Sequence, residues 1–166
     1  GTNLYIADSY NQTIRKIVIA TGVTTTIAGT VGSSGFADGT GAAAQFNIPS
    51  DITTDGNNLY VTDPYSHTIR KIVISSGEVS TIAGIHGSSG ADDGIGEDAR
   101  FDSLAGITTD GTYLYLLDTR TVRKVNIRTR EVSTLAGDPS IGGSEDGDGS
   151  DSLFAAPAGI TTEGTS

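Results

Sequence analysis

Several residue types are missing from this 166-residue sequence: it contains no cysteine, methionine or tryptophan. Without cysteine, disulfide bonds and cysteine-based zinc sites are both excluded. Because methionine is also absent from the first position, we expect a fragment or a processed product of a longer chain, in which signal and anchor segments would not be visible. No apolar run approaches the roughly 18 residues of a transmembrane helix, so we expect no membrane span.

Basic side chains are also scarce. The 10 Lys and Arg residues face 20 Asp and Glu residues, which gives a net charge of −10 and a pI near 4.3. A surface this acidic repels a phosphate backbone, so we expect no nucleic-acid partner. The absence of cysteine and the abundance of Thr, Ser and Gly favour an extracellular or cell-surface location in a bacterium.

What the sequence does contain is one segment in three near-copies. GTNLYIADSYNQTIRKI begins at Gly1, GNNLYVTDPYSHTIRKI at Gly56 and GTYLYLLDTRTVRKV at Gly111, so successive copies start 55 residues apart. We therefore divide the chain into repeats 1–55, 56–110 and 111–166, the last of which includes the start of a fourth copy. A period of this length indicates stacked supersecondary units that cannot bury their apolar faces alone.

The second repeat contains four runs that are typical of β-strands, rich in β-branched and aromatic residues. The expected strands are residues 51–56, 58–63, 68–74 and 78–84. Apolar side chains follow one another directly in Leu59-Tyr60-Val61, so both faces of the sheet should be covered by neighbouring repeats. Four-stranded sheets that stack radially form a β-propeller, which closes with roughly 4 to 8 blades. Helical solenoids are excluded because no stretch has a helical period.

The motifs DGxxLYxxD, IRKI and STIAG resemble the NHL family of β-propeller repeats over essentially the whole chain. The segment DGxGxxAxF precedes each innermost strand, at 38–46, 93–101 and, with Ser152 in place of Ala, 146–154, and is similar to the long-loop bacterial form of the repeat. The resemblance implies an all-β fold of three four-stranded blades, either half of a six-bladed ring or part of a larger propeller. Arg130 departs from the pattern because it occupies the hairpin position of Gly22 and Gly77, where a left-handed backbone would cost about 1 kcal/mol.

The two ends of the chain are expected to be complementary. The sequence begins at a second strand, 3–8, and ends after a first strand, 159–162. Three blades alone would leave a bare strand edge and wet apolar faces. We therefore expect either a head-to-tail homo-oligomer, such as a six-bladed dimer, or further repeats in a longer parent chain, with 159–162 pairing with 3–8 in both.

One acid at the end of the second strand and one arginine in the third strand recur in every repeat. A repeated charged binding site is one interpretation. A structural one is favoured, because an Asp at a strand end satisfies loop amides and an adjacent Arg neutralises its buried charge. These structural candidates are Asp8, Asp63, Asp118, Arg15, Arg70 and Arg123.

Acidic residues crowd two of the glycine-rich loops, which raises the question of calcium. The metal candidates are Asp92, Asp93, Asp146 and Asp148. Asp146 and Asp148 have the opening spacing of an EF-hand loop, but the required Gly is Asp151 and the closing Glu is Pro157. We therefore expect no cofactor, with calcium as the alternative.

The GxG of each DGxGxxAxF segment is expected to permit tight turns, since a phosphate-binding loop must open a true helix and only one helical turn fits here. The phenylalanines of these segments, Phe46, Phe101 and Phe154, are expected to fill the gaps between blades. His67 and His86 lie in loops of different context, and we expect isolated surface histidines.

Loops on one propeller face remain as the candidate site. The partner-binding candidates are Tyr10, Asn11, Phe36, Tyr65, His67 and Arg120. Exposed aromatics beside polar groups are typical of protein- and glycan-binding surfaces, although Tyr10 and Tyr65 could instead cap their own loops. We predict a non-catalytic binding or structural scaffold for a protein or carbohydrate partner. The alternatives are a six-bladed lactonase- or lyase-type enzyme with its catalytic residues in missing blades, and RNA binding, which the charge disfavours.

Overall fold

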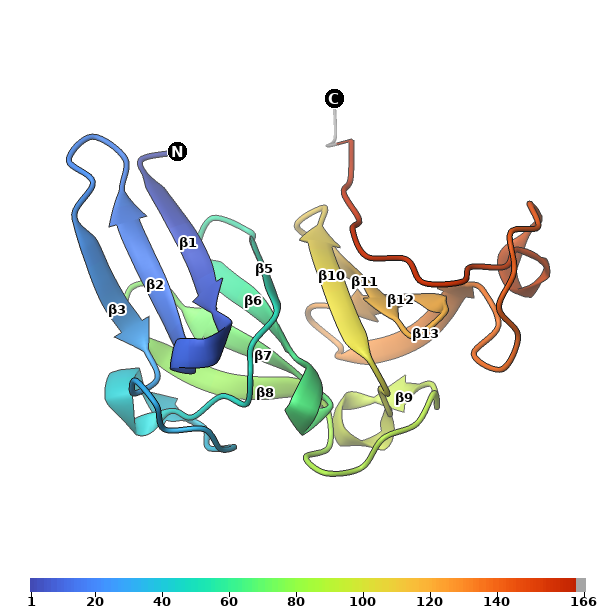
Figure 1. The fold of residues 1–166 in the computed structure, drawn as a ribbon, viewed down its shortest axis with the longest axis horizontal. Helices are drawn as coiled ribbons and strands as arrows, with labels where there is room; N and C mark the ends of the chain where they lie inside the picture. The colour runs from blue at the N-terminus through green and yellow to red at the C-terminus, as the bar shows by residue number, and fades with distance from the viewer. Residues whose placement is uncertain (164–166) are drawn as a thin grey trace.

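The computed structural model describes residues 1–163 as an all-β chain in which three antiparallel sheets follow one another (Figure 1). The first sheet contains β1 (Asn3–Asp8), β2 (Thr13–Val18) and β3 (Thr24–Ala28). The second contains β5 (Asp51–Thr54), β6 (Asn58–Asp63), β7 (Thr68–Val73) and β8 (Glu78–Gly84). The third contains β10 (Leu104–Thr109), β11 (Tyr113–Asp118), β12 (Thr121–Asn126) and β13 (Glu131–Ala136). We call these sheets blades 1, 2 and 3; the predicted all-β propeller segment is confirmed.

Each blade is a meander whose neighbouring strands are joined by short turns. In blade 2, β6 and β7 pair in continuous register from Asn58↔Val73 to Asp63↔Thr68, and β1 and β2 of blade 1 repeat this register. Single 3-10 turns make the connection, η1 (Ser9–Asn11) in blade 1 and η3 (Pro64–Ser66) in blade 2. The helices within residues 1–163 are turns of this size, and none has the length and hydropathy needed to cross a membrane.

The DGxGxxAxF segments run along the outer edge of the blades. Each contains one 3-10 turn, as predicted: η2 (Gly41–Ala43), η4 (Gly96–Asp98) and η5 (Gly149–Asp151). The first two segments also add a two-residue fifth strand that the sequence did not predict. β4 (Gly39–Thr40) pairs with β8, and β9 (Gly94–Ile95) pairs with β13.

The apolar core lies between blades and not within them. One cluster joins Ile14 and Ala28 of blade 1 to Leu59, Val61 and Ile72 of blade 2. A second cluster joins blades 2 and 3 in the same way. Phe46 belongs to the first cluster and Phe101 to the second, and both are fully buried, which confirms their predicted place. Phe154 has no described blade beyond it and stays partly exposed.

Two local predictions have different outcomes. Arg130 has φ 62°, close to the 69° and 71° of Gly22 and Gly77, so the left-handed hairpin position is confirmed. The strand predicted at 159–162 is wrong: these residues form no strand, although the Thr162 hydroxyl donates to the Thr109 carbonyl oxygen of β10 at 3.2 Å. A strand needs a ladder partner, and within residues 1–163 no second strand follows this segment.

Candidate functional site

The repeated acid and arginine form a buried ion pair in blade 2. Asp63, at the end of β6, lies 3.3 Å from Arg70 of β7, and both side chains are fully buried. The backbone amide of Asn47 donates a hydrogen bond to the Asp63 carboxylate at 2.8 Å. Arg70 also reaches Asp38, in the DGxGxxAxF loop, at 2.8 Å. Burial raises the pKa of Asp63, and the Asn47 amide and the Arg70 charge oppose that rise.

Blade 3 repeats this site residue for residue. Asp118 lies 3.0 Å from Arg123, whose other nitrogen reaches Asp93 at 2.9 Å. Asp118 accepts hydrogen bonds from the amides of Asp102 and Ser103, each at 2.9 Å. Burial raises the pKa of Asp118 despite these hydrogen bonds and the nearby Arg123 charge.

Aromatic rings cover the buried guanidinium groups. Arg70 lies 4.9 Å from the ring centroid of Phe36 and 5.1 Å from that of Phe46, and Arg123 lies 5.2 Å from that of Phe101. A cation over a ring face is stabilised by the ring quadrupole. This geometry fits the structural interpretation of the Asp and Arg residues, because neither arginine has surface left for a ligand. It stays a prediction that substitutions of these Asp and Arg residues leave partner binding unchanged.

Blade 1 holds the same pair in a more open setting. Asp8 lies 3.1 Å from Arg15, and each side chain keeps 28% of its exposure. The side-chain amide of Asn11 donates to both Asp8 oxygens, at 3.0 and 3.1 Å. Asn11 was a partner-binding candidate, but its amide serves the local turn.

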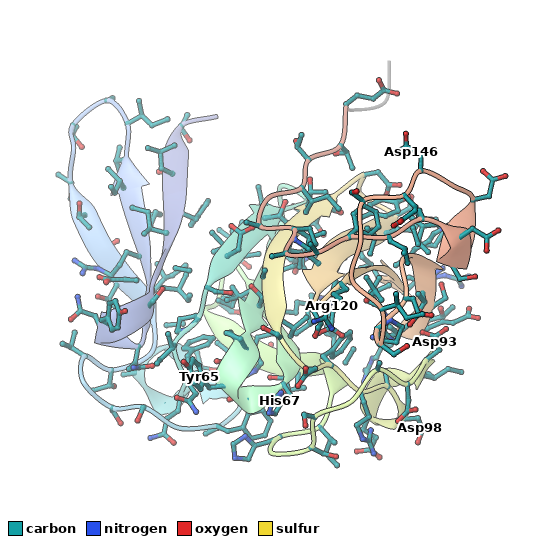
Figure 2. All side chains as sticks on the ribbon, turned by 45° about the vertical axis from the view of Figure 1, so that its right-hand side comes forward. Tyr65, His67, Asp93, Asp98, Arg120 and Asp146 are labelled. Atoms are coloured by element: carbon teal, nitrogen blue, oxygen red, sulfur yellow. The ribbon has the colours of Figure 1, made fainter. Side chains whose placement is uncertain are left out.

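Tyrosines stand out from the turns that follow the second strands. Tyr10 in η1 is 89% exposed and Tyr65 in η3 is 63% exposed. His67 follows Tyr65 with φ 57°, and its ring nitrogen Nδ1 lies 3.0 Å from the Asp102 carbonyl oxygen. Tyr65, His67 and Ser103 line a cavity of about 490 Å³ between blades 2 and 3. Figure 2 shows Tyr65 and His67 together at the lower side of the ribbon.

Phe36 lies in a different cavity. Its ring stacks on His86, with centroids 4.6 Å apart and planes 3° from parallel. The two rings line a cavity of about 720 Å³ together with Ile95, Glu97 and Arg130. His86 is exposed, as expected of a surface residue, but it is not isolated as was also expected, because its ring stacks on Phe36. The available signal was that Phe36 and His86 are not repeated: Ala91 and Ser144 match Phe36, while Val31 and Pro139 match His86.

Arg120 joins neither cavity. Its guanidinium donates to the Pro139 carbonyl oxygen at 3.4 Å, and Gly142 lies so close to its side chain that a Cβ there would meet Nε at 2.8 Å. Arg120 therefore packs on the loop of its own blade. The structure brings Tyr65 and His67 together and leaves Tyr10, Phe36 and Arg120 in separate places.

The acidic candidates for a metal are dispersed. Asp93 accepts hydrogen bonds from Arg123 and from the backbone amide and hydroxyl of Thr134, so both of its carboxylate oxygens already have protein partners. The backbone carbonyl of Asp92 accepts from Arg123 at 3.0 Å, and Asp146 and Asp148 lie on the exposed C-terminal loop. Across residues 1–163, no three His, Asp or Glu side chains are grouped so that they could hold a metal ion.

Comparisons with known sequences find partial matches. No family model matches the chain. NHL repeat-containing protein 2 of Gallus gallus is 37% identical over 92 residues, which cover 55% of this chain and 12% of that protein. Protein SUPPRESSOR OF QUENCHING 1, chloroplastic, of Arabidopsis thaliana is 39% identical over 80 residues, or 48% of this chain and 8% of that protein. The chain thus spans a small part of the curated relatives that it matches.

Comparisons with solved structures cover nearly the whole chain. A structural genomics protein of unknown function from Bacteroides thetaiotaomicron has a TM-score of 0.80 at 25% identity, over 98% of this chain and 40% of that one. An auxiliary nutrient binding protein from the same species has a TM-score of 0.72 at 21% identity, over 96% and 40%. Virginiamycin B lyase from Staphylococcus aureus has a TM-score of 0.55 at 14% identity, over 82% and 39%. These likenesses show a propeller-type fold, on which both binding proteins and lyases occur.

Proposed function

We propose that this chain is an NHL-type propeller segment of an exported bacterial protein, and that it acts as a non-catalytic module that binds a carbohydrate or protein partner. The observation that carries the proposal is the exposure of Tyr10 and Tyr65 at equivalent positions of adjacent blades. A tyrosine that capped its own loop would pack on it, whereas these two rings are mostly in water. Rigid aromatic side chains that are not needed for packing are common anchors at binding surfaces.

The surroundings of Tyr65 support the same role. Tyr65 and His67 line one side of a shared cavity with aromatic rings, and Asp102 and Ser103 line it with polar groups. Short 3-10 turns hold both tyrosines on a stacked β scaffold, so little conformational entropy is lost when they bind. The solved auxiliary nutrient binding protein is an example of a binding role on this fold.

A lyase-like activity is the alternative that the sequence left open. In that alternative the catalytic groups lie in blades outside residues 1–163. Within that range, the His67 ring contacts the Asp102 carbonyl oxygen and the His86 ring stacks on Phe36. No observation on the described residues favours it over binding.

An array of immobilised glycans tests the proposal. Tyr10→Ala and Tyr65→Ala should each weaken the binding of glycans retained by the wild-type chain, and the double substitution should weaken it by at least about tenfold. Tyr113→Ala is the matched control, because Tyr113 lies at the far end of β11 from the turn that follows Asp118. Glycan binding that survives the double substitution would contradict the proposed face.

A further inference from the structure

The cavity that contains the Phe36 and His86 rings lies between blades 2 and 3 and has a volume of about 720 Å³. Its walls come from β8, from the turn η4 and from the hairpin that joins β12 to β13. All of its lining residues fall between Phe36 and Arg130, so two described blades bound it and neither end of the chain does. Small-molecule sites have volumes of roughly 300 to 1,000 Å³, and this cavity is within that range.

The residues that give this cavity its chemistry depart from the repeat. Phe36 and His86 are not repeated, and neither are Ile95, Glu97 and Arg130. One repeat earlier, the last three positions hold Thr40, Ala42 and Gly77. The residues that build the blades recur in every copy, whereas these five meet in one cavity. They therefore give it a composition that the repeated scaffold does not require.

Arg130 is held in a strained backbone conformation, with φ 62°. Its amide donates to the Asn126 carbonyl oxygen at 2.8 Å, and its own carbonyl oxygen accepts from the Gly96 amide at 3.0 Å. The side chain passes over Gly96, where a Cβ would lie 4.0 Å from Arg130 Cδ. No ion pair engages the Arg130 guanidinium within residues 1–163. Strain that gains no structural contact in return is typical of residues retained for function.

Glu97 brings the opposite charge to the same cavity. It lies in η4, is exposed, and forms no ion pair with Arg130 or with any other cation in the described part of the chain. An anion alone would be repelled by Glu97 and by Asp38, whose side chain keeps 49% of its exposure, and a cation alone would be repelled by Arg130. A ligand that complements both unpaired charges carries a carboxylate and an ammonium group.

Apolar side chains line the rest of the cavity. Ile82 belongs to the core between blades 2 and 3 and keeps 6% of its exposure. Ile85 and Ile95 are 38% and 60% exposed, and the exposed His86 ring lies beside them in the lining. Covering these surfaces is favourable only for an apolar ligand body.

We propose that this cavity binds a zwitterion with an apolar body, which is the chemistry of an apolar amino acid or a short apolar peptide. The Arg130 guanidinium would pair with the ligand carboxylate, and the Glu97 carboxylate would accept from its ammonium group. The apolar side chain would lie against Ile95 and the His86 ring. This site is separate from Tyr10 and Tyr65, and the inference does not depend on the proposed function.

Isothermal titration calorimetry on the purified chain tests this inference with leucine and trileucine as probes. At least one of them should bind with a dissociation constant below about 1 mM. The amide of that probe lacks the carboxylate and its N-acetyl form lacks the ammonium group, so each should bind at least about tenfold more weakly. Tighter binding of leucine supports a free amino acid as the ligand, and tighter binding of trileucine supports a peptide.

Substitutions of the two charged residues locate the binding. Arg130→Gly and Glu97→Gln should each weaken it by at least about tenfold. Arg128→Gly and Asp98→Asn make matched changes at exposed neighbours that do not line the cavity, and should leave binding unchanged. Arg130→Gly also relieves the strained backbone, so its urea unfolding midpoint should be no lower than that of the wild type, which separates lost binding from lost folding.

Three results would overturn the proposal. One is a wild-type chain that binds neither probe at millimolar concentration. Another is an amide and an N-acetyl form that bind as tightly as the parent probe, because the two charges would then play no part. The third is a pair of Arg130→Gly and Glu97→Gln chains that bind the probe like the wild type.

Discussion

Blades 1 and 2 contain the same hexapeptide, TIRKIV, as β2 and as β7, yet its burial differs. Ile72 of β7 is fully buried, while Ile17 of β2 keeps part of its exposure. The preceding strands differ more: Leu59 and Val61 are fully buried, whereas their equivalents Leu4 and Ile6 are 53% and 39% exposed. Identical local sequence therefore gives different burial, because a neighbouring blade covers each face and blade 1 has one described neighbour while blade 2 has two.

The charged residues follow the same rule. In blade 2, Arg70 and Asp63 are fully buried, and Arg70 forms ion pairs with two acids. In blade 1, Arg15 and Asp8 are partly exposed to water, and Arg15 forms an ion pair with one acid. A buried ion pair tolerates the loss of one partner poorly, and a solvated pair contributes little. Equivalent substitutions in the two blades should therefore have unequal effects.

The largest difference is expected for the strand-end acid. Asp63→Ala should lower the free energy of unfolding by about 3 kcal/mol, because it removes one charge beside a fully buried guanidinium. Asp8→Ala should cost less than about 1 kcal/mol. Urea unfolding of both variants measures the two losses in free energy of unfolding. Equal losses would show that the ion pair of blade 1 is as buried as that of blade 2. Partner binding per folded molecule should be the same in Asp63→Ala as in the wild type.

A second pair of substitutions compares the identical isoleucines. Ile72→Ala should cost about 2–4 kcal/mol, because it opens a cavity in the core between blades 1 and 2. Ile17→Ala removes the same atoms from a partly wet surface and should cost about half as much. Both variants replace an isoleucine by alanine. The difference between their losses in free energy of unfolding, measured by heat or urea, therefore reports the effect of the covering blade. A larger loss for Ile17→Ala would contradict this account.

The hairpin between the third and fourth strands offers a comparison across all blades. Arg130 holds φ 62° where blades 1 and 2 have glycine, and a side chain in that region is strained. Arg130→Gly should raise the free energy of unfolding by about 1 kcal/mol. Gly77→Arg, its mirror substitution, should lower it by a similar amount. A destabilised Arg130→Gly chain would mean that the Arg130 side chain makes a contact that outweighs the strain.

The smallest expected effect concerns pH and the two acids of blade 2. Burial acts to raise the pKa of Asp55, but hydrogen bonds from Asn58, from nearby amides and from the Tyr60 hydroxyl outweigh it, so its pKa lies below the usual value. An acid with a lowered pKa in the folded state stabilises the fold above its unfolded pKa of about 3.9, and loses that contribution as the pH falls through the folded pKa. The stability gap between wild type and Asp55→Asn should therefore narrow below about pH 4.

Asp63 should show the opposite trend. Burial raises its pKa, so the folded state binds the proton more tightly than the unfolded chain does. Its contribution to stability therefore falls as the pH rises from the unfolded pKa to the folded one. The gap between wild type and Asp63→Asn should widen as the pH is lowered across that range. Parallel pH profiles for the two variants would contradict the assigned environments.

The repeat pattern was enough to place most of the fold. It predicted β6 and β8 to the residue, the single helical turns of the DGxGxxAxF segments, and the buried Phe46 and Phe101. These features depend on local propensity and on residues that recur in every blade. It did not predict β4 and β9, because two-residue strands carry no period of their own.

The candidate site was predicted less well. Tyr10 and Tyr65 are exposed on their turns as the binding interpretation required, but Asn11 binds Asp8 and Arg120 packs on its own loop. The contact between Phe36 and His86 could not be predicted from spacing, since the two residues are 50 positions apart along the chain and lie in different loops. Only the departure of both positions from the repeat marked them as unusual.

By itself, the sequence determined the strands, the turns and the residues that face between blades, because hydrogen-bonded hairpins and alternating side chains are local properties. Tertiary structure alone decided which of those faces are covered. Arg70 is enclosed and Arg15 is not, and 159–162 lies along β10 without becoming a strand. The physical reason is that burial and strand pairing each need a second surface, and the sequence of one repeat does not contain the surface of its neighbour.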